Sequence, residues 1–160
     1  MRQKKRSAID VGKTLAQIYH LRPPFSTGPD GKPSSFRSGL IERCERLLVT
    51  PLRQFEPGDL RVMLGQQFYP ETLVLLALLL LESDPLLDGD FFPGDLLCST
   101  LAQSNEFWTA YPDLLTRIQD VLQRVSDVSV PDGAYPDDFV QTAIEEFNVR
   151  LGLPSTKRLK

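Results

Sequence analysis

The residues that could do chemistry in this chain are mainly carboxylates, and they are densest between residues 84 and 95. This segment contains Asp84, Asp88, Asp90 and Asp95. Carboxylates at such density could bind a divalent cation or assist a hydrolytic reaction. The spacing does not fit a calcium-binding loop, because Phe91 and Phe92 stand where that loop requires oxygen ligands. Helix starts, turns and solvated surface explain the same carboxylates without a reaction, so we expect the exposed ones to bind a partner.

Three further candidates for chemistry lack the sequence context that they need. The Gly-Lys-Thr segment at 12–14 resembles the end of a phosphate-binding loop, but Ser7 stands where that motif requires glycine. His20 is the single histidine, and no nucleophile motif accompanies it. Cys44 and Cys98 lie too far apart for a zinc pattern and are expected to be buried thiols. We therefore predict no catalytic residue, no bound metal and no cofactor.

The size and composition suit one globular domain with its own hydrophobic core. A chain of 160 residues with 41% hydrophobic residues can bury enough apolar surface to fold without disulfides or metals. The basic N-terminal segment is not followed by the apolar stretch of a signal peptide, and we expect a cytoplasmic protein. The strongest apolar run, at 73–81, is far shorter than the ~20 residues of a membrane-spanning helix. It predicts a core helix that is buried on all sides.

The charges are strongly segregated along the chain. Residues 1–53 carry 11 Lys or Arg and 4 Asp or Glu, a net charge of +7. Residues 54–148 carry 3 Lys or Arg and 17 Asp or Glu, a net charge of −14, and residues 149–160 add +4. The middle of the chain is therefore an acidic body with basic ends. Such a body attracts cationic proteins and repels nucleic acid.

The pattern of apolar residues predicts helices and no convincing strand. The helices are expected at about 38–50, 57–67, 70–83, 93–103, 111–126 and 137–151. Residues 7–21 form either a short helix or an irregular segment, and Trp108 is expected in the core. The predicted core face of the last helix consists of Phe139, Val140, Ala143, Ile144, Phe147 and Leu151.

These elements predict an all-α fold, a compact bundle of about six helices around the central apolar helix at 73–81. The whole chain, residues 1–160, is predicted to be a single domain. A basic arm at 1–6, a loop at 22–38 and a basic tail at 153–160 are expected to be flexible.

The same four residue types, Pro-Gly-Asp-Leu, occur at 57–60 and again at 93–96. Proline suits the first position of a helix, and aspartate in the first turn interacts favourably with the helix dipole. Both segments are therefore expected to start a short helix in the same way. Whether they reflect an internal repeat is left open, since four residues are too few to establish one.

Several segments together resemble the immunity proteins of contact-dependent growth inhibition (CDI) systems. They are Pro-Leu at 51–52, Asp-Leu-Arg-Val-Met-Leu-Gly-Gln at 59–66, Gly-Asp-Phe-Phe-Pro-Gly-Asp-Leu-Leu at 89–97 and Phe-Trp at 107–108. The resemblance covers residues 36–125 well and 7–20 loosely. The chain departs from the family pattern at Gln-Phe-Tyr-Pro, residues 67–70, and in the extended loop at 22–38. The resemblance therefore implies the class of the partner and not a particular toxin.

The resemblance implies an immunity protein that binds and neutralises a toxin domain delivered by a sister cell, often a nuclease, by covering its active site. An acidic surface suits a cationic nuclease, so the charge pattern independently agrees. The family motifs are expected to be structural: Asp59 and Asp95 start helices, Arg61 pairs with a carboxylate, and Gln66 bonds to backbone. The expected toxin contacts are Asp84, Asp88, Asp90, Asp132, Asp137 and Asp138, with Tyr135 as an aromatic anchor.

Two other functions are open to a chain of this kind. A helical regulator could bind nucleic acid through the basic residues 1–53, although these residues are scattered and form no helix-turn-helix pattern. An enzyme could use the carboxylates between 84 and 95, but the sequence lacks a catalytic constellation around them. We therefore expect a non-enzymatic binding protein whose partner is the toxin domain of a CDI exoprotein, with no membrane and no nucleic acid involved.

Overall fold

The computed structural model of the chain describes residues 8–23, 25, 38–125 and 137–155. The expected basic arm at 1–6 and most of the loop at 22–38 and of the tail at 153–160 lie outside these residues. The chain divides into two compact units, residues 1–55 and 56–160, and each is described by itself. The single domain expected for residues 1–160 stays a prediction.

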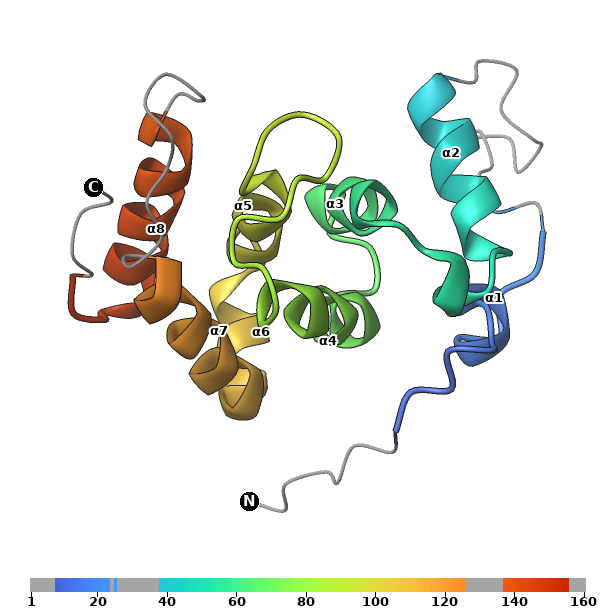
Figure 1. The fold of residues 1–160 in the computed structure, drawn as a ribbon. Helices are drawn as coiled ribbons and strands as arrows, with labels where there is room; N and C mark the ends of the chain where they lie inside the picture. The colour runs from blue at the N-terminus through green and yellow to red at the C-terminus, as the bar shows by residue number, and fades with distance from the viewer. Residues whose placement is uncertain (1–7, 24, 26–37, 126–136, 156–160) are drawn as a thin grey trace. The chain divides into compact units, whose positions relative to one another are not determined.

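The described residues form eight α-helices and one short 3₁₀ helix, and they contain no strand, so the predicted all-α class is confirmed (Figure 1). The unit of residues 1–55 contains α1 (Leu15–Ile18), α2 (Gly39–Leu48) and η1 (Leu52–Gln54). The unit of residues 56–160 contains α3 (Pro57–Gly65), α4 (Pro70–Leu81), α5 (Asp95–Leu101), α6 (Asn105–Ala110), α7 (Pro112–Val125) and α8 (Asp137–Leu151). The helices beyond the expected six are the short α1 and α6.

The first unit is held together by its caps and by a short backbone pairing. The Ser38 side chain accepts a hydrogen bond from Ile41 N and starts α2. Backbone hydrogen bonds from Leu52 N to Lys13 O and from Arg53 N to Val11 O join the segment before α1 to η1. The buried side chains of α2 are Cys44, Leu47 and Leu48.

The Gly-Lys-Thr segment has a structural role in this unit, because its threonine caps α1. Thr14 accepts a hydrogen bond from Gln17 N and forms a capping box at the start of α1. His20 is exposed. The Gly-Lys-Thr segment is followed only by the four residues of α1, whereas a phosphate-binding loop is followed by a long helix.

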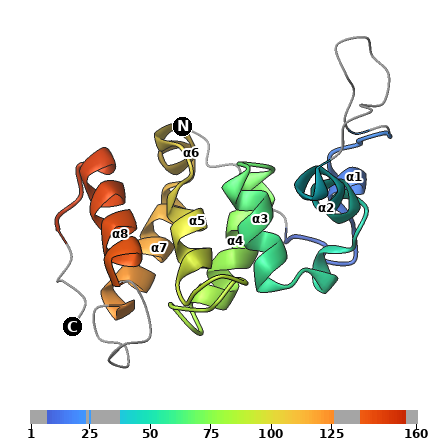
Figure 2. The same cartoon turned by 90° about the horizontal axis from the view of Figure 1, so that it is seen from above.

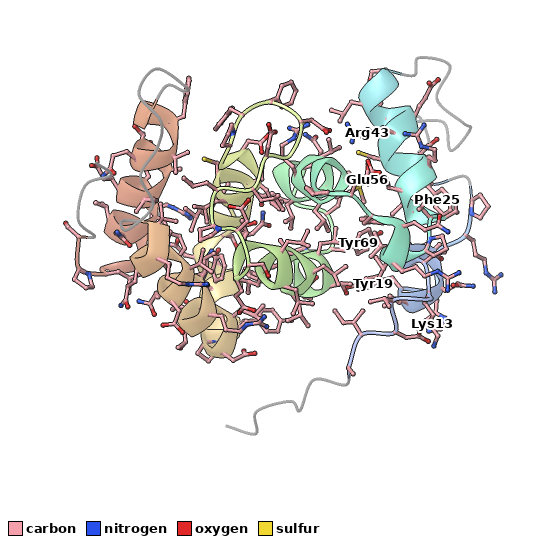
Figure 3. All side chains as sticks on the ribbon, in the orientation of Figure 1. Lys13, Tyr19, Phe25, Arg43, Glu56 and Tyr69 are labelled. Atoms are coloured by element: carbon pink, nitrogen blue, oxygen red, sulfur yellow. The ribbon has the colours of Figure 1, made fainter. Side chains whose placement is uncertain are left out.

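Helix α3 begins as its sequence predicts. Pro57 occupies the first turn, and the Asp59 carboxylate accepts a hydrogen bond from Glu56 N over 3.1 Å. This contact closes a capping box and places a negative charge at the positive end of the helix dipole. The segment after α3 contains two residues with left-handed backbone, Gln67 with φ 56° and Tyr69 with φ 50°, and Tyr69 stands immediately before α4 (Figure 3).

Helix α4 is the central apolar helix, and it contacts α3, α5 and α7 (Figures 1 and 2). Leu73, Ala77 and Leu78 are fully buried in these contacts. The expectation that the helix is buried on all sides is wrong, because Leu79 is 54% exposed and its neighbours Leu75, Leu76 and Leu80 are only half-buried. Apolar side chains project from every side of this helix, whereas the neighbouring helices cover only part of its circumference. No helix in the described part of the chain is long and apolar enough to cross a membrane.

Aromatic packing joins α6 and α8 in the core of this unit. Trp108 is fully buried, as expected, and its ring makes edge-to-face contacts with Phe107 at 5.0 Å and Phe147 at 5.4 Å. Such pairs stabilise a core by about 0.5–1.5 kcal/mol beyond the area they bury. The expected core face of α8 is only partly confirmed: Val140, Ile144 and Phe147 are buried, Ala143 and Leu151 are half-buried, and Phe139 is exposed.

A buried glutamine, Gln103, connects the ends of α3 and α5. Its side-chain amide donates hydrogen bonds to Leu64 O and Ser99 O, each over 2.9 Å, and the residue is 1% exposed. The expectation that Gln66 performs such a role is wrong, since Gln66 is exposed and its side chain makes no hydrogen bond to the described residues. The family motif at 59–66 favoured Gln66, but of these two glutamines only Gln103 lies inside the core.

The two glutamines give a matched test of this packing. We expect Gln103→Leu to lower the free energy of unfolding by about 1–3 kcal/mol, because a buried amide that satisfies two carbonyl oxygens is removed. Gln66→Leu, the control, is expected to change it by less than about 0.5 kcal/mol. Urea unfolding followed by circular dichroism measures both values, and equal effects of the two substitutions would contradict the assignment.

Candidate functional site

Three of the expected partner-binding carboxylates lie together on the segment between α4 and α5, which we call the 84–94 loop. Asp84, Asp88 and Asp90 are all exposed there. Asp84 accepts a hydrogen bond from Leu86 N, and Asp88 accepts one from Asp90 N over 2.9 Å. These local bonds are typical of aspartates in turns, so the turn role predicted for this segment is confirmed.

The other expected contacts cannot be placed beside this loop. Asp132 and Tyr135 lie outside the described residues. Asp137 and Asp138 occupy the start of α8, but the structure describes only their backbone. These four residues therefore remain predictions as binding residues.

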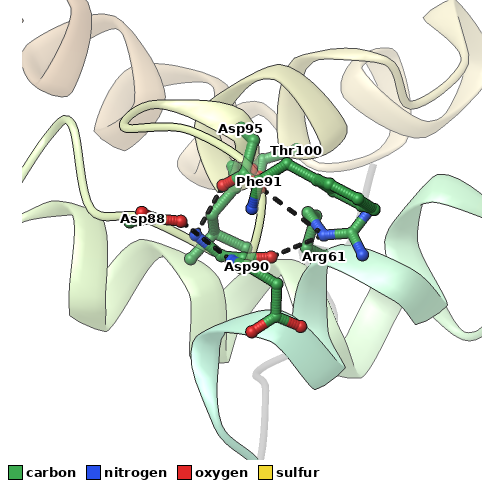
Figure 4. A network of polar contacts seen from close by, with 8 residues as sticks. Arg61, Asp88, Asp90, Phe91, Asp95 and Thr100 are labelled. Carbon is green, nitrogen blue, oxygen red and sulfur yellow. Dashed lines mark hydrogen bonds and ion pairs between the residues drawn. The ribbon is translucent and has the colours of Figure 1, made fainter. Parts of the chain in front are cut away.

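The 84–94 loop is anchored by the buried carboxylate of Asp95, the first residue of α5. Asp95 is 3% exposed. Its Oδ1 accepts a hydrogen bond from Gly89 N over 2.5 Å, and its Oδ2 accepts one from Phe91 N over 3.0 Å (Figure 4). A buried carboxylate is costly unless it is hydrogen-bonded or paired, and here two backbone N–H groups of the loop meet that need.

Arg61 of α3 approaches the same carboxylate and fixes the loop from the other side. Its Nε lies 3.6 Å from Asp95 Oδ2 and donates a hydrogen bond to Gly89 O over 2.6 Å (Figure 4). The expectation that Arg61 pairs with a carboxylate is thus confirmed. The Arg61 guanidinium carbon also lies 4.2 Å from the centre of the Phe91 ring, a distance that suits a cation–π contact.

The two Pro-Gly-Asp-Leu segments do not start their helices in the same way, contrary to the expectation. Pro57 is the first residue of α3, whereas α5 starts only at Asp95, two residues after Pro93. Gly94 adopts a φ of 92°, and a Cβ there would lie 2.7 Å from Val140 Cγ2. The loop bonds of Asp95 and the close approach of α8 therefore give the second segment a different conformation.

The backbone of Asp90 is unusual and its carboxylate lies against α3. Asp90 has a φ of 96°, a conformation that costs a non-glycine residue on the order of 1–3 kcal/mol. Gly58, in the first turn of α3, has no side chain, and a Cβ there would collide with the Asp90 carboxylate. The absence of a side chain at Gly58 thus lets a negative charge approach the N-terminal end of α3, where the helix dipole favours it. Asp90 therefore has a structural role in addition to its exposure.

Two exposed aromatic rings belong to this region, and the sequence analysis missed both. Phe91 is 71% exposed and Phe139 is 61% exposed. The rings of Phe139 and Phe92 lie 5.9 Å apart, so the second exposed ring lies beside the 84–94 loop. The only sequence feature that indicates the exposure of Phe91 is its position beside the polar turn of Asp88, Gly89 and Asp90.

Burial disfavours the reactive form of the Cys98 thiol in this region. It is half-buried, not fully buried as expected, and its thiol lies near Phe139 O. Burial, followed by the negative charge of Asp95, raises the pKa of Cys98 to about 11. The thiolate that would react is therefore scarce at neutral pH. Among the described residues, no group of three or more His, Cys, Asp or Glu side chains could hold a metal ion.

The 84–94 loop presents carboxylates and an aromatic ring from an anchored backbone, and these are features of protein-binding surfaces. A family model described as CDI immunity proteins matches residues 28–118, which is more than half of the chain. The chain therefore belongs to the CDI immunity protein family, as its sequence motifs indicated. The matched segment includes Arg61, the 84–94 loop and Asp95. Searches of curated proteins and of solved structures found no match.

The start of the loop is fixed by an ion pair between the end of α4 and α7. Arg117 donates two hydrogen bonds to the Glu82 carboxylate, over 2.6 and 2.9 Å. The hydrogen bond from Arg117 is the main cause that holds the pKa of Glu82 below its ordinary value. Arg124 also donates to Glu82 O, so two arginines of α7 hold the residue from which the loop leaves α4.

This pair predicts a pH dependence of stability. A lowered pKa in the folded state stabilises the protein above the unfolded-state pKa of Glu82, and the contribution is lost as the pH falls through the folded-state value. Because the pair is partly exposed, we expect Glu82→Gln to lower the free energy of unfolding by about 0.5–1 kcal/mol at neutral pH. The difference from the unsubstituted protein should shrink as the pH falls through the lowered folded-state pKa of Glu82.

Urea midpoints measured between neutral and acidic pH test this expectation. Glu146→Gln, which replaces an exposed carboxylate of α8, is the control and should not change the midpoint. A Glu82→Gln effect that is constant across the pH range would show that the ion pair is not its cause.

Proposed function

We propose that this protein neutralises the toxin domain of a CDI exoprotein by binding it directly and covering its active site. Membership of the CDI immunity family supports toxin neutralisation. The further elements of the proposal are that the toxin is a nuclease and that one immunity protein occludes one toxin domain. The protein acts as a stoichiometric inhibitor, without catalysis, in the cytoplasm of the cell that receives the toxin from a sister cell.

The observation that supports a nuclease partner is the concentration of negative charge. Residues 54–148 carry a net charge of −14, while the 84–94 loop presents exposed carboxylates from an anchored backbone. A nuclease active site is cationic because it holds phosphate, so a negatively charged surface of suitable shape competes with the substrate. Complementary charge also accelerates association, by factors of about 10–10³ at low salt.

The proposed contact residues are those expected from the sequence. The structure separates Asp84 and Asp88, which make only local bonds, from Asp90, which also supports the loop. Asp84 and Asp88 are exposed and make only local turn bonds, so they are free to face a partner. Asp90 lies against Gly58, so its substitution would change the loop as well as the surface charge. Asp132, Tyr135, Asp137 and Asp138 complete the proposed set.

Charge reversal on the loop tests the electrostatic part of the proposal. We expect Asp84→Lys combined with Asp88→Lys to slow association with the toxin domain by about tenfold at low ionic strength, and by less at high salt. Stopped-flow or surface-plasmon measurements with the toxin domain encoded beside this gene supply the rates. The matched control is Glu145→Lys combined with Glu146→Lys, two exposed carboxylates of α8.

Inhibition of nuclease activity by the unsubstituted protein should reach completion at one equivalent. Two results would overturn the proposal. One is turnover of a substrate by the purified protein alone, and the other is no affinity for the neighbouring toxin domain. If both double substitutions slow association equally, the 84–94 loop is not the preferred contact surface.

A further inference from the structure

We propose that Phe91 is the main anchor of the toxin interface and that Arg61 is a positioning residue that holds its ring ready for binding. The inference rests on the proposed function, because it concerns the surface through which the toxin is bound. It goes further by naming the side chain that dominates affinity and by describing the surface that it fits. That surface is an apolar pocket bordered by lysine or arginine side chains.

The exposure of Phe91 is the first observation. A phenylalanine ring buries a large apolar area when it enters a core or an interface, yet this ring is 71% exposed on a loop that is otherwise firmly held. Large apolar side chains of this kind, located in a well-defined surface, are typical of the few residues that provide most of the energy in a protein interface. Phe139, beside the same loop, extends the apolar area.

The position of the ring is fixed before any partner arrives. The Asp95 carboxylate accepts a hydrogen bond from the backbone N–H of Phe91, and the guanidinium carbon of Arg61 lies 4.2 Å from the ring centre. Arg61 is itself held by Gly89 O and by the Asp95 carboxylate. Ordering a side chain and a loop on binding ordinarily costs affinity, and here much of that ordering is already present in the free protein.

The charges around the ring indicate what kind of pocket it enters. Asp88 and Asp90 are exposed on the loop that carries Phe91, and the cation beneath the ring, Arg61, is paired with the buried Asp95. A partner that accepts the ring therefore also meets a loop whose other exposed residues are Asp84, Asp88 and Asp90. This combination of an apolar centre and a charged rim fits a cationic partner. A second copy of this protein that docked through the same loop, as in a symmetric dimer, would place like charges against one another, so we assign the surface to the toxin.

The direct test removes the ring. We expect Phe91→Ala to weaken binding of the full-length protein to its toxin domain by about 30-fold or more, mainly through faster dissociation. The melting temperature should change little, because the ring is exposed. Phe68→Ala, which removes a ring that is 43% exposed outside the loop, is the control and should weaken binding less than threefold. Isothermal calorimetry and dissociation rates provide the readouts.

The role of Arg61 is tested by a double-substitution cycle. Arg61→Lys keeps the charge but removes the planar guanidinium and the Nε hydrogen bond, and we expect an intermediate loss of affinity. In the Phe91→Ala background the same substitution should cost little further affinity, because there is no ring left to position. Equal losses in both backgrounds would show that Arg61 acts on the toxin surface independently or through overall stability, and would overturn the positioning role.

The outcomes separate this inference from the proposed function. If the unsubstituted protein binds and inhibits the toxin while Phe91→Ala binds equally well, the inference is overturned and the proposed function stands. If the unsubstituted protein does not bind the toxin domain, both are overturned. A dimer that forms in sedimentation experiments and is lost in Phe91→Ala would overturn the inference by assigning the ring to contact between copies.

Discussion

The structure of the proposed binding surface depends on one buried carboxylate, that of Asp95. Asp95 is the first residue of α5. Its carboxylate accepts hydrogen bonds from two N–H groups of the 84–94 loop and lies within ion-pair distance of Arg61 on α3. Without such partners a buried charge would be strongly unfavourable, so the burial of Asp95 requires the loop to remain in place. The same requirement fixes the exposed side chains that the loop presents, which connects the packing of the core to the composition of the surface.

The sequence predicted the long helices well because their apolar stripes extend over several turns. Helix α7 and the start of α3 follow their predicted bounds closely. The short helices α1 and α6 contain too few residues to show a period, so their caps were the only signal. The two identical Pro-Gly-Asp-Leu segments adopt different conformations because their contacts differ. Asp59 bonds to its own helix start, whereas Asp95 bonds to the preceding loop.

The surface was less predictable than the fold, and the reason is physical. Charge density located the carboxylates of the 84–94 loop, since clustered aspartates near turn residues are rarely buried. The exposure of Phe91 and Phe139 could not be found in this way, because an apolar residue that continues a helical stripe or follows a turn gives no sign of facing solvent. Phe139 continues the stripe of α8 in sequence but is 61% exposed. The burial of Asp95 likewise required knowledge of Arg61, which is distant in sequence and close in space.

Asp95 and Arg61 hold the 84–94 loop through hydrogen bonds to its main chain, not to its side chains. Asp95 binds the N–H groups of Gly89 and Phe91, and Arg61 binds the carbonyl of Gly89. Main-chain groups are the same for almost every amino acid, so these bonds do not restrict the residue type. The tight restrictions fall on Gly89, which is buried and close to the Asp95 carboxylate, and on Gly94, which has a φ of 92° and lies against Val140. A position such as Phe91, whose backbone N–H is bound by Asp95, can exchange its side chain while the loop keeps its path. A single scaffold of this design can therefore change its partner through a few surface substitutions without having to fold anew.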